Sequence, residues 1–230
     1  MVSIIKMNYF LKIYKILNFI IYGRFDNFLK EVNGLIHIGA NTGQERDHYK
    51  KFNLKKVLWV EADPLVYLQL KDNIKSYKGQ VAYNYLLTDK INQKYHFNIA
   101  NNNSASSSIF EFFDHKKMYP HVNFIKKINL YSSTFSRMIK KEHVNIRDFN
   151  ALILDTQGSE LLILKGASNL LKYFTYIKVE AADFKLYKNS CLLNEISNYL
   201  KKYNFKEIKR IQIDQNKQFG IIFDVLYSKL

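Results

Sequence analysis

The regular alternation of short apolar runs with amphipathic segments constrains the fold most strongly. Five apolar runs have the length of strands, at residues 34–39, 56–62, 81–87, 150–156 and 174–182. Segments with helical spacing of apolar residues lie between or after them, at residues 43–53, 64–79, 159–173 and 190–204. Strands that alternate with helices predict parallel pairing, with the helices on both faces of one sheet.

Two more strands are expected after the last of these helices, at residues 205–211 and 220–229. The chain between them is too short for a crossover helix, so we expect them to form an antiparallel edge of the sheet. The whole pattern predicts an α/β fold with a Rossmann-like, doubly wound, mostly parallel sheet of seven strands. A chain of 230 residues is long enough for one such domain, which we place at residues 34–230.

The composition argues against several functional classes. A single cysteine, Cys191, excludes an internal disulfide framework, and no Cys/His group has the spacing of a zinc site. We therefore expect a reducing, cytoplasmic environment. The net charge of +15 comes from 30 lysines and only five arginines. Because arginine is favoured for bidentate contacts with phosphates and bases, this mixture argues against a nucleic-acid partner.

Residues 1–33 predict an amphipathic N-terminal helical segment. Its apolar residues are interrupted by Lys6, Lys12 and Lys15, so it is too polar to span a bilayer, and no signal-peptide cleavage site follows it. Two interpretations stay open. The helix packs on the domain or covers its ligand site, or it contacts a membrane surface. We favour the first.

The turn from Gly39 to Gly43 indicates a ligand site at the carboxyl end of the first strand. Glycine lets the backbone approach a ligand closely, and the amides of the following helix point toward it. Glu61 ends the second strand, at the spacing of about 20 residues that is typical of an acid binding both ribose hydroxyls of an adenosine. The turn lacks a complete G-x-G-x-x-G pattern, which favours S-adenosylmethionine over NAD as the cofactor.

Five segments carry a family resemblance. They are "IHIGANTGQE", "VEADP", "SASSSIF", "LILDTQGSELLILKGA" and "YIKVEAADFKLY", in this order along the chain. With them the chain resembles the FkbM-type S-adenosylmethionine-dependent methyltransferases from about Leu35 to the C-terminus, and the fourth segment is the most specific. The resemblance implies a class I methyltransferase fold and transfer of a methyl group to oxygen, often a hydroxyl of a sugar or glycan.

The resemblance also implies which residues bind S-adenosyl-L-methionine: His37, Gly39, Ala40, Asn41, Gly43, Glu61, Ala62, Thr88, Asp89 and Ser107. Among them, Glu61 matches the ribose acid, and Thr88 and Asp89 match the segment that borders adenine. His37 departs from the aspartate that is usual at the first position. We expect it to hydrogen-bond the turn in place of that acid, not to catalyse the reaction.

Two acids at neighbouring strand ends are the candidate catalytic residues. Asp155 ends the fourth strand, where it is placed to remove the proton of an acceptor hydroxyl. Glu180 ends the fifth strand and assists Asp155 or shares a divalent metal with it, because two carboxylates at adjacent strand ends suit Mg²⁺. A third interpretation, that Asp155 only orients the cofactor and the backbone, stays open.

Residues 101–124 interrupt the strand–helix alternation and predict a substrate-binding insertion. Serine hydroxyls and the aromatic side chain of Tyr119 suit a carbohydrate or sugar-nucleotide substrate, and His115 is an alternative base. Two other functions remain as alternatives: an RNA ribose methyltransferase that uses the lysine-rich surface, or a basic binding module that has lost activity. The segment "LDTQG" differs from the signature of enzymes that methylate base nitrogens.

Overall fold

A computed structural model of the protein describes residues 25–230. Residue contacts divide the chain after Glu31, and the described part of the first unit contains one short 3-10 helix, η1 (Asp26–Glu31). Most of the helical segment expected at residues 1–33 lies outside the described residues. The second unit, Val32–Leu230, contains all the elements considered below. In the described part of the chain, no helix combines the length and the apolar character needed to cross a membrane.

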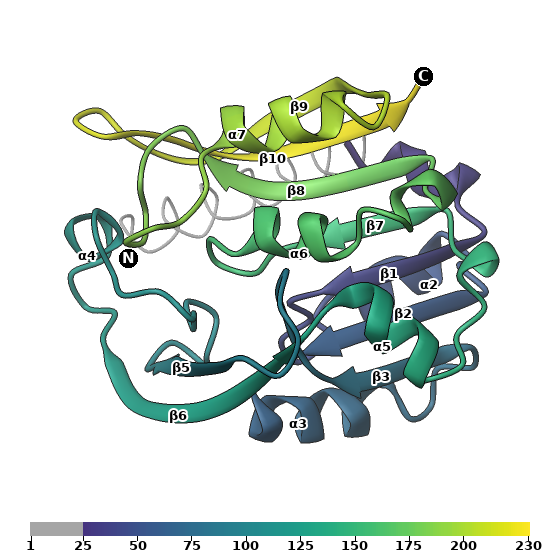
Figure 1. Ribbon diagram of the computed structural model, residues 1–230, viewed down its shortest axis with the longest axis horizontal. Coiled ribbons are helices and arrows are strands. Elements are labelled where there is room, and N and C mark those ends of the chain that lie inside the picture. The colour runs from purple at the N-terminus through teal and green to yellow at the C-terminus, as the bar shows by residue number, and fades with distance from the viewer. Residues whose placement is uncertain (1–24) are drawn as a thin grey trace, which may run out of the picture. The chain divides into compact units, whose positions relative to one another are not determined.

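A seven-stranded sheet forms the centre of the second unit (Figure 1). Its order is β3-β2-β1-β7-β8-β10-β9. The five strands from β3 to β8 are parallel, whereas β10 runs antiparallel to both β8 and β9. The bounds are β1 (Gly34–Ile38), β2 (Lys56–Glu61), β3 (Gln80–Asn84), β7 (Ala151–Leu154), β8 (Tyr176–Ala182), β9 (Phe205–Asn216) and β10 (Gly220–Lys229). The expected mostly parallel sheet of seven strands is confirmed.

Helices connect the parallel strands. Figure 1 shows α5 (Phe135–Lys141) and α6 (Glu160–Gly166) in front of the sheet and α2 (Arg46–Lys51) behind it. The other helices are α3 (Pro64–Ile74), α4 (His115–Met118), α7 (Leu193–Lys201) and the 3-10 turns η2 (Ile146–Asp148) and η3 (Leu171–Tyr173). Pro64 occupies the first turn of α3, and the Asp63 side chain accepts a hydrogen bond from the Leu65 amide as the N-cap.

The main core lies between the sheet and α5, α6 and α7. Alternate residues of β1, such as Ile36 and Ile38, contribute to it together with Leu152 and Leu154 of β7. His37 lies between the two isoleucines and therefore points to the opposite face of the sheet. Alternate residues of β1 therefore face opposite sides of the sheet, and only His37 of these three faces away from the main core.

One predicted strand is divided in the structure, and a second sheet was not predicted. The run at residues 81–87 forms the end of β3 and then β4 (Leu86–Leu87), which joins β5 (Lys94–Ala100) and β6 (Phe124–Ser133) in the order β4-β6-β5. Charged and polar residues alternate with apolar ones in β5 and β6, and many are exposed. Neither strand therefore contains the continuous apolar run that marked the strands of the main sheet.

Candidate active site

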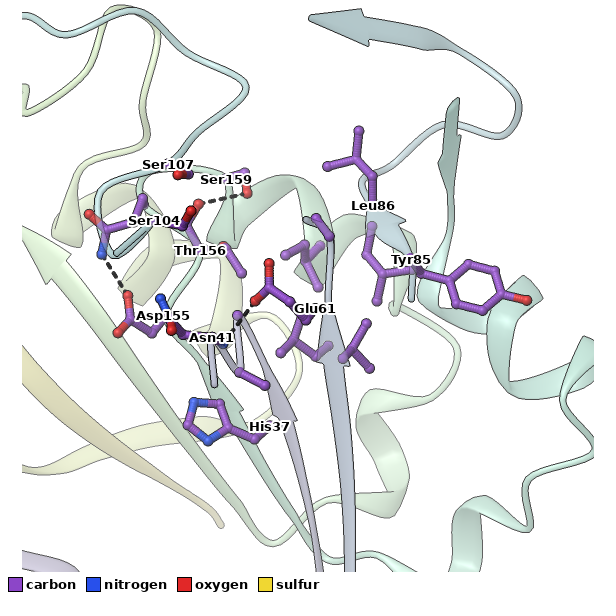
Figure 2. Close-up of a pocket in the computed structure, with 18 of the residues that line it drawn as sticks. His37, Asn41, Glu61, Tyr85, Leu86, Ser104, Ser107, Asp155, Thr156 and Ser159 are labelled. Atoms are coloured by element: carbon purple, nitrogen blue, oxygen red, sulfur yellow. Dashed lines mark hydrogen bonds between the residues drawn. The ribbon is translucent and has the colours of Figure 1, made fainter. Parts of the chain in front are cut away.

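A cavity lies at the carboxyl ends of β1, β2 and β7, where the parallel strand order reverses direction around β1 (Figure 2). The space between its walls, including the open mouth, is about 810 Å³. Seven of the ten residues expected to bind the cofactor line it: His37, Gly39, Ala40, Asn41, Glu61, Ala62 and Ser107. The cavity is thus at the place where doubly wound sheets bind their ligands.

The turn after β1 is packed tightly against its neighbours. Gly39 has a φ of +84°, and a Cβ atom added there would lie 1.7 Å from the backbone oxygen of Asp155. The amides of Gly39 and Ala40 both donate to the Val60 carbonyl, at 3.0 and 3.1 Å. A side chain at position 39 is therefore excluded both by the backbone conformation and by the end of β7.

Glu61 is held beside this turn by two backbone amides. Its Oε2 accepts from the Asn41 amide at 2.8 Å (Figure 2). Its Oε1 accepts from the Asp63 amide at 2.8 Å. The side chain lines the cavity but is only 8% exposed, and burial raises its pKa to about 7. A carboxylate has about four acceptor positions, so each oxygen can accept one more hydrogen bond from a ligand.

Asp155 and Glu180 are connected through one side chain, that of Gln157. The Gln157 Nε2 atom donates to Asp155 Oδ1 at 2.7 Å and to Glu180 Oε1 at 3.2 Å. Asp155 lines the cavity, whereas Glu180 lines a smaller neighbouring one. Burial raises the pKa of both carboxyls, and in Glu180 the charge of Asp155 raises it further. Two buried acids that have perturbed pKa values and share one hydrogen-bond donor are typical of a site for proton transfer.

Glu160 supports the loop between Asp155 and α6, a role that the sequence did not indicate. Its Oε1 accepts from the Thr156 amide at 2.8 Å and from the Gly158 amide at 3.1 Å. The residue is 2% exposed. These bonds fix the backbone of the loop that carries Gln157.

The first part of the insertion covers the cavity. Ser104 and Ser107 line it, and the Ser107 hydroxyl accepts from the Ala100 amide at 3.0 Å. The Asn103 carbonyl accepts from Asn41 Nδ2 at 3.1 Å, and the Ser104 hydroxyl donates to Asp63 at 3.2 Å. The insertion is thereby attached to the ends of both β1 and β2.

His115 lies outside the lining of the cavity. Its ring stacks on Phe112 at a centroid distance of 4.3 Å and is 3% exposed. Nε2 lies 3.0 Å from the Ser106 hydroxyl, and Nδ1 is buried without a hydrogen-bond partner among the described residues. Burial lowers the pKa of His115 to about 4, so the ring is neutral at physiological pH.

His37 contacts aromatic residues behind the turn. Its ring stacks on Trp59 at 5.2 Å, and Nδ1 lies 3.0 Å from the hydroxyl of Tyr49 in α2. Burial lowers the pKa of His37. The hydrogen bond of its ring thus connects β1 to α2, and Figure 2 shows the ring below the Asn41–Glu61 pair.

Three of the expected cofactor residues are not part of the lining. Gly43 packs against Leu70 of α3. Thr88 is fully buried and its hydroxyl accepts from the Lys90 amide, and Asp89 follows it. The apolar end of the cavity is formed instead by residues that the motifs did not single out: Leu86, Leu87, Phe97, Ile109 and Ile163.

The donor set does not support the expected magnesium site. Within residues 25–230, no group of three or more His, Cys, Asp and Glu side chains is arranged to hold a metal ion. The amide of Gln157 donates to Asp155 Oδ1 and Glu180 Oε1, so an N–H donor lies where a cation shared by these two oxygens would bind.

Comparison with known proteins identifies the family of this chain. Residues 37–207, well over half of the chain, match the methyltransferase FkbM domain. The chain belongs to the FkbM methyltransferase family. It is accordingly an S-adenosylmethionine-dependent methyltransferase, and the resemblance inferred from the five sequence segments is confirmed. A comparison with curated proteins found no significant match.

Solved structures show the same fold at low sequence identity. The methyltransferase domain of bacterial CtHen1-CN is 12% identical, with a TM-score of 0.51 over 92% of this FkbM chain and 99% of that chain. TrmK of M. capricolum, solved with S-adenosyl-homocysteine, is 9% identical, with a TM-score of 0.50 over 90% and 67% of the two chains. An uncharacterized Listeria monocytogenes protein is 8% identical, with a TM-score of 0.47, and this chain spans only 62% of its length. The first two matches establish a class I methyltransferase-like fold.

Proposed function

We propose that this FkbM methyltransferase methylates a hydroxyl oxygen, most directly because of where Asp155 lies. The residue follows β7, lines the cavity and is adjacent to the Gly39 turn. Its Oδ1 is hydrogen-bonded to Gln157, which leaves Oδ2 as the oxygen that can accept a proton from a substrate. A carboxylate held in this way is suited to act as a general base.

The cavity residues fit S-adenosylmethionine. Glu61 offers a buried carboxylate to the two ribose hydroxyls, and the Gly39 turn offers backbone groups to the amino-acid end. The apolar walls formed by Leu86, Phe97 and Ile163 suit the two faces of a flat adenine ring. We therefore place adenine at this end of the cavity, beside Leu86 and not beside Thr88 and Asp89.

The reaction assigns separate tasks to the protein and to the cofactor. When bound, S-adenosylmethionine supplies a methyl group whose bond to sulfur breaks as the acceptor oxygen bonds to the carbon, with the electron pair left on sulfur. Asp155 takes the proton of the acceptor hydroxyl on Oδ2. The raised pKa of Asp155 lies closer to neutral pH. A base with such a pKa is still ionised in part of the resting enzyme and holds a proton more strongly than an ordinary aspartate.

A sugar or glycan is the proposed acceptor. The family resemblance supports this class, and the insertion contributes Ser104, Ala105 and Ser107 to one side of the cavity. The hydroxyls of Ser106, Ser107 and Ser108 are already bonded within the protein. Tyr119 lies outside the lining, where its hydroxyl donates to Asp214. We therefore assign the acceptor wall to residues 104–107 rather than to the whole insertion.

Transfer of label from S-adenosylmethionine tests this function. The protein is incubated with the labelled cofactor and, separately, with nucleotide sugars, free glycans and RNA. We expect label in a sugar as an alkali-stable ether. Label in RNA, with rates that fall steeply as salt rises, would identify the lysine-rich surface as a nucleic-acid site and replace the sugar proposal. A protein that binds no cofactor and transfers no label would be the inactive binding module.

A further inference from the structure

We propose that Gln157 is a positioning residue that orients the Asp155 base through its side-chain amide. The inference rests on the proposed function for its kinetic consequence, but its structural basis is independent of the acceptor. Gln157 follows β7 by three residues, and its amide nitrogen is within hydrogen-bond distance of both Asp155 and Glu180. Asp155 follows β7 and Glu180 lies in β8, so the amide links two neighbouring strands of the sheet.

The other end of the Gln157 amide is also fixed. Its Oε1 accepts from the hydroxyl of Tyr187 at 2.7 Å, and Tyr187 is fully buried. Because the tyrosine hydroxyl occupies the amide oxygen, the amide nitrogen is the end turned toward the two acids. The orientation of the amide therefore does not depend on the acids alone.

The backbone of Gln157 is held in an uncommon conformation. Its φ is +55°, in the left-handed region, and its carbonyl accepts from the Ser108 hydroxyl at 2.8 Å. The amides of the residues on either side of it, Thr156 and Gly158, donate to Glu160, as described above. Non-glycine residues in this region cost free energy and are concentrated at functional sites. Here the conformation directs the side chain to the acids while the backbone contacts the insertion.

The surroundings of the two acids explain why a neutral donor is suited to this position. Besides each other, the charged or titratable groups that face Asp155 or Glu180 are Glu45, Glu160, Tyr119, Tyr187 and Asp224. Asp224 pairs with Lys178 at 2.9 Å. Three of the neighbouring groups are acids, so an amide that donates one hydrogen bond to each carboxyl holds their direction without neutralising the base.

The hydrogen bonds determine which oxygen of Asp155 faces the substrate. Gln157 binds Oδ1, so Oδ2 is the oxygen left to accept the proton of the acceptor hydroxyl. Without the amide, the carboxyl can rotate about χ2, a broad torsion, and the base loses its alignment. Misplacement of a reacting group by about 1 Å costs up to roughly a hundredfold in rate.

Two substitutions separate this role from a structural one. Gln157→Met keeps the length of the side chain but removes both hydrogen-bonding ends. Gln157→Glu keeps an oxygen for Tyr187 but replaces the donor that faces the acids. We expect both variants to lose roughly tenfold to a hundredfold in kcat, with the KM for S-adenosylmethionine within about twofold of the original value. Gln212→Met, the same change at an exposed position of β9, is the matched control and should not change kcat.

The kinetic results decide between the two roles. If Gln157 only holds Tyr187, Gln157→Glu will turn over at the original rate, and the proposal is wrong. Equal losses in kcat and in cofactor affinity, together with a lower melting temperature, would also overturn it, because they indicate general damage to the fold. Loss of kcat in both variants with unchanged cofactor affinity supports it.

A spectroscopic measurement tests the geometry without any acceptor. The side-chain amide protons of Gln157 are assigned in the cofactor-free, ¹⁵N-labelled protein from the pair of signals missing in Gln157→Met. We expect Asp155→Asn and Glu180→Gln each to move these signals, while those of Gln212 stay in place. Signals that respond to neither substitution would contradict the geometry. If they respond but no sugar is methylated, the proposed function fails and the positioning role of the amide stands.

Discussion

At the scale of single residues, the site depends on carboxyl groups that are withdrawn from water and held by amide donors. Glu61 is held by two backbone amides, and Asp155 by the amide of Gln157. In each case burial raises the pKa of the carboxyl. The same environment that positions these groups therefore brings their titration closer to physiological pH.

Glu61 should make adenosine binding depend on pH. The carboxylate accepts hydrogen bonds from both ribose hydroxyls only when it is ionised, and its pKa in the free protein is about 7. We expect the affinity for 5′-methylthioadenosine, which has the ribose and adenine but no titrating amino acid, to rise as the pH increases from 6 to 8. At pH values below the pKa, the affinity should change by at most about tenfold per pH unit.

Calorimetry with three variants checks this expectation. Glu61→Ala removes two charge-assisted hydrogen bonds of about 1.5–3 kcal/mol each, so binding should weaken roughly a hundredfold or more. Glu61→Gln should remove the dependence on pH, whereas Asp155→Asn should keep it. Unchanged affinity in a folded Glu61→Ala protein would refute the assignment of Glu61 to the ribose.

Asp155→Asn should separate binding from turnover. Asparagine has nearly the same shape as aspartate but cannot take the proton of the acceptor. We expect cofactor affinity to stay within a few fold and kcat to fall by about 10²- to 10⁴-fold, the contribution of a positioned base. Single-turnover rates with the methylated acceptor as the readout measure the effect. A rate equal to that of the original protein would leave Asp155 with the orienting role only.

The sequence could identify some of these residues and not others. Glu61 and Asp155 were found because each ends an apolar run at a spacing that has a chemical meaning. Gln157 gave no such signal, since its role depends on a hydrogen bond to Glu180, which is distant in sequence. His37 was expected to bond the turn, but its orientation follows from the Tyr49 hydroxyl, a contact between β1 and α2 that no local pattern reveals.

At the scale of elements, the central strands β1, β2 and β7 were predictable because they are buried on both faces and read as continuous apolar runs. The small sheet was not, because β5 and β6 expose many of their side chains. Phe97 illustrates the consequence: it lies on β5 and lines the cavity, yet nothing in the local sequence connects it to the cofactor. Because β5 was not predicted, the part of the cavity wall that it forms was not predicted either.

The first part of the insertion should respond to cofactor binding. It is attached to the turn by the Asn41–Asn103 hydrogen bond and to the end of β2 by the Ser104–Asp63 bond. We expect S-adenosylhomocysteine to slow hydrogen exchange of amides 39–43 and 103–108, because ligand contacts stabilise the closed loop against local opening. The β9–β10 hairpin is the internal control. Equal protection of both regions would indicate only global stabilisation.

At the scale of the whole molecule, a chain with a net charge of +15 concentrates acids at one place. Asp155 and Glu160 follow β7, and Glu180 lies in β8. Burial raises the pKa of all three carboxyls. A carboxyl whose pKa is higher in the folded than in the unfolded protein binds more protons in the folded state. Its contribution to stability is complete below the unfolded pKa of about 4.3 and is lost as the pH rises through the folded pKa.

Glu180→Gln should therefore change the dependence of stability on pH. Glutamine keeps the oxygen that accepts from Gln157 but does not ionise. We expect the melting temperature of the variant, relative to the original protein, to increase as the pH rises from 5 to 8. Thermal unfolding of the cofactor-free proteins at several pH values measures this difference. A difference that stays constant over that range would show that Glu180 ionises as easily in the folded protein as in the unfolded one.

The position of β10 has a consequence for the order in which this edge of the sheet can form. β9 precedes β10 in the chain, but β10 lies between β8 and β9 in the sheet. Because β9 pairs with β10 and β10 pairs with β8, β9 can join the sheet only together with β10 or after it. Until β10 arrives, the edge of β8 is an unpaired strand edge that a chaperone or a second copy of the chain can bind.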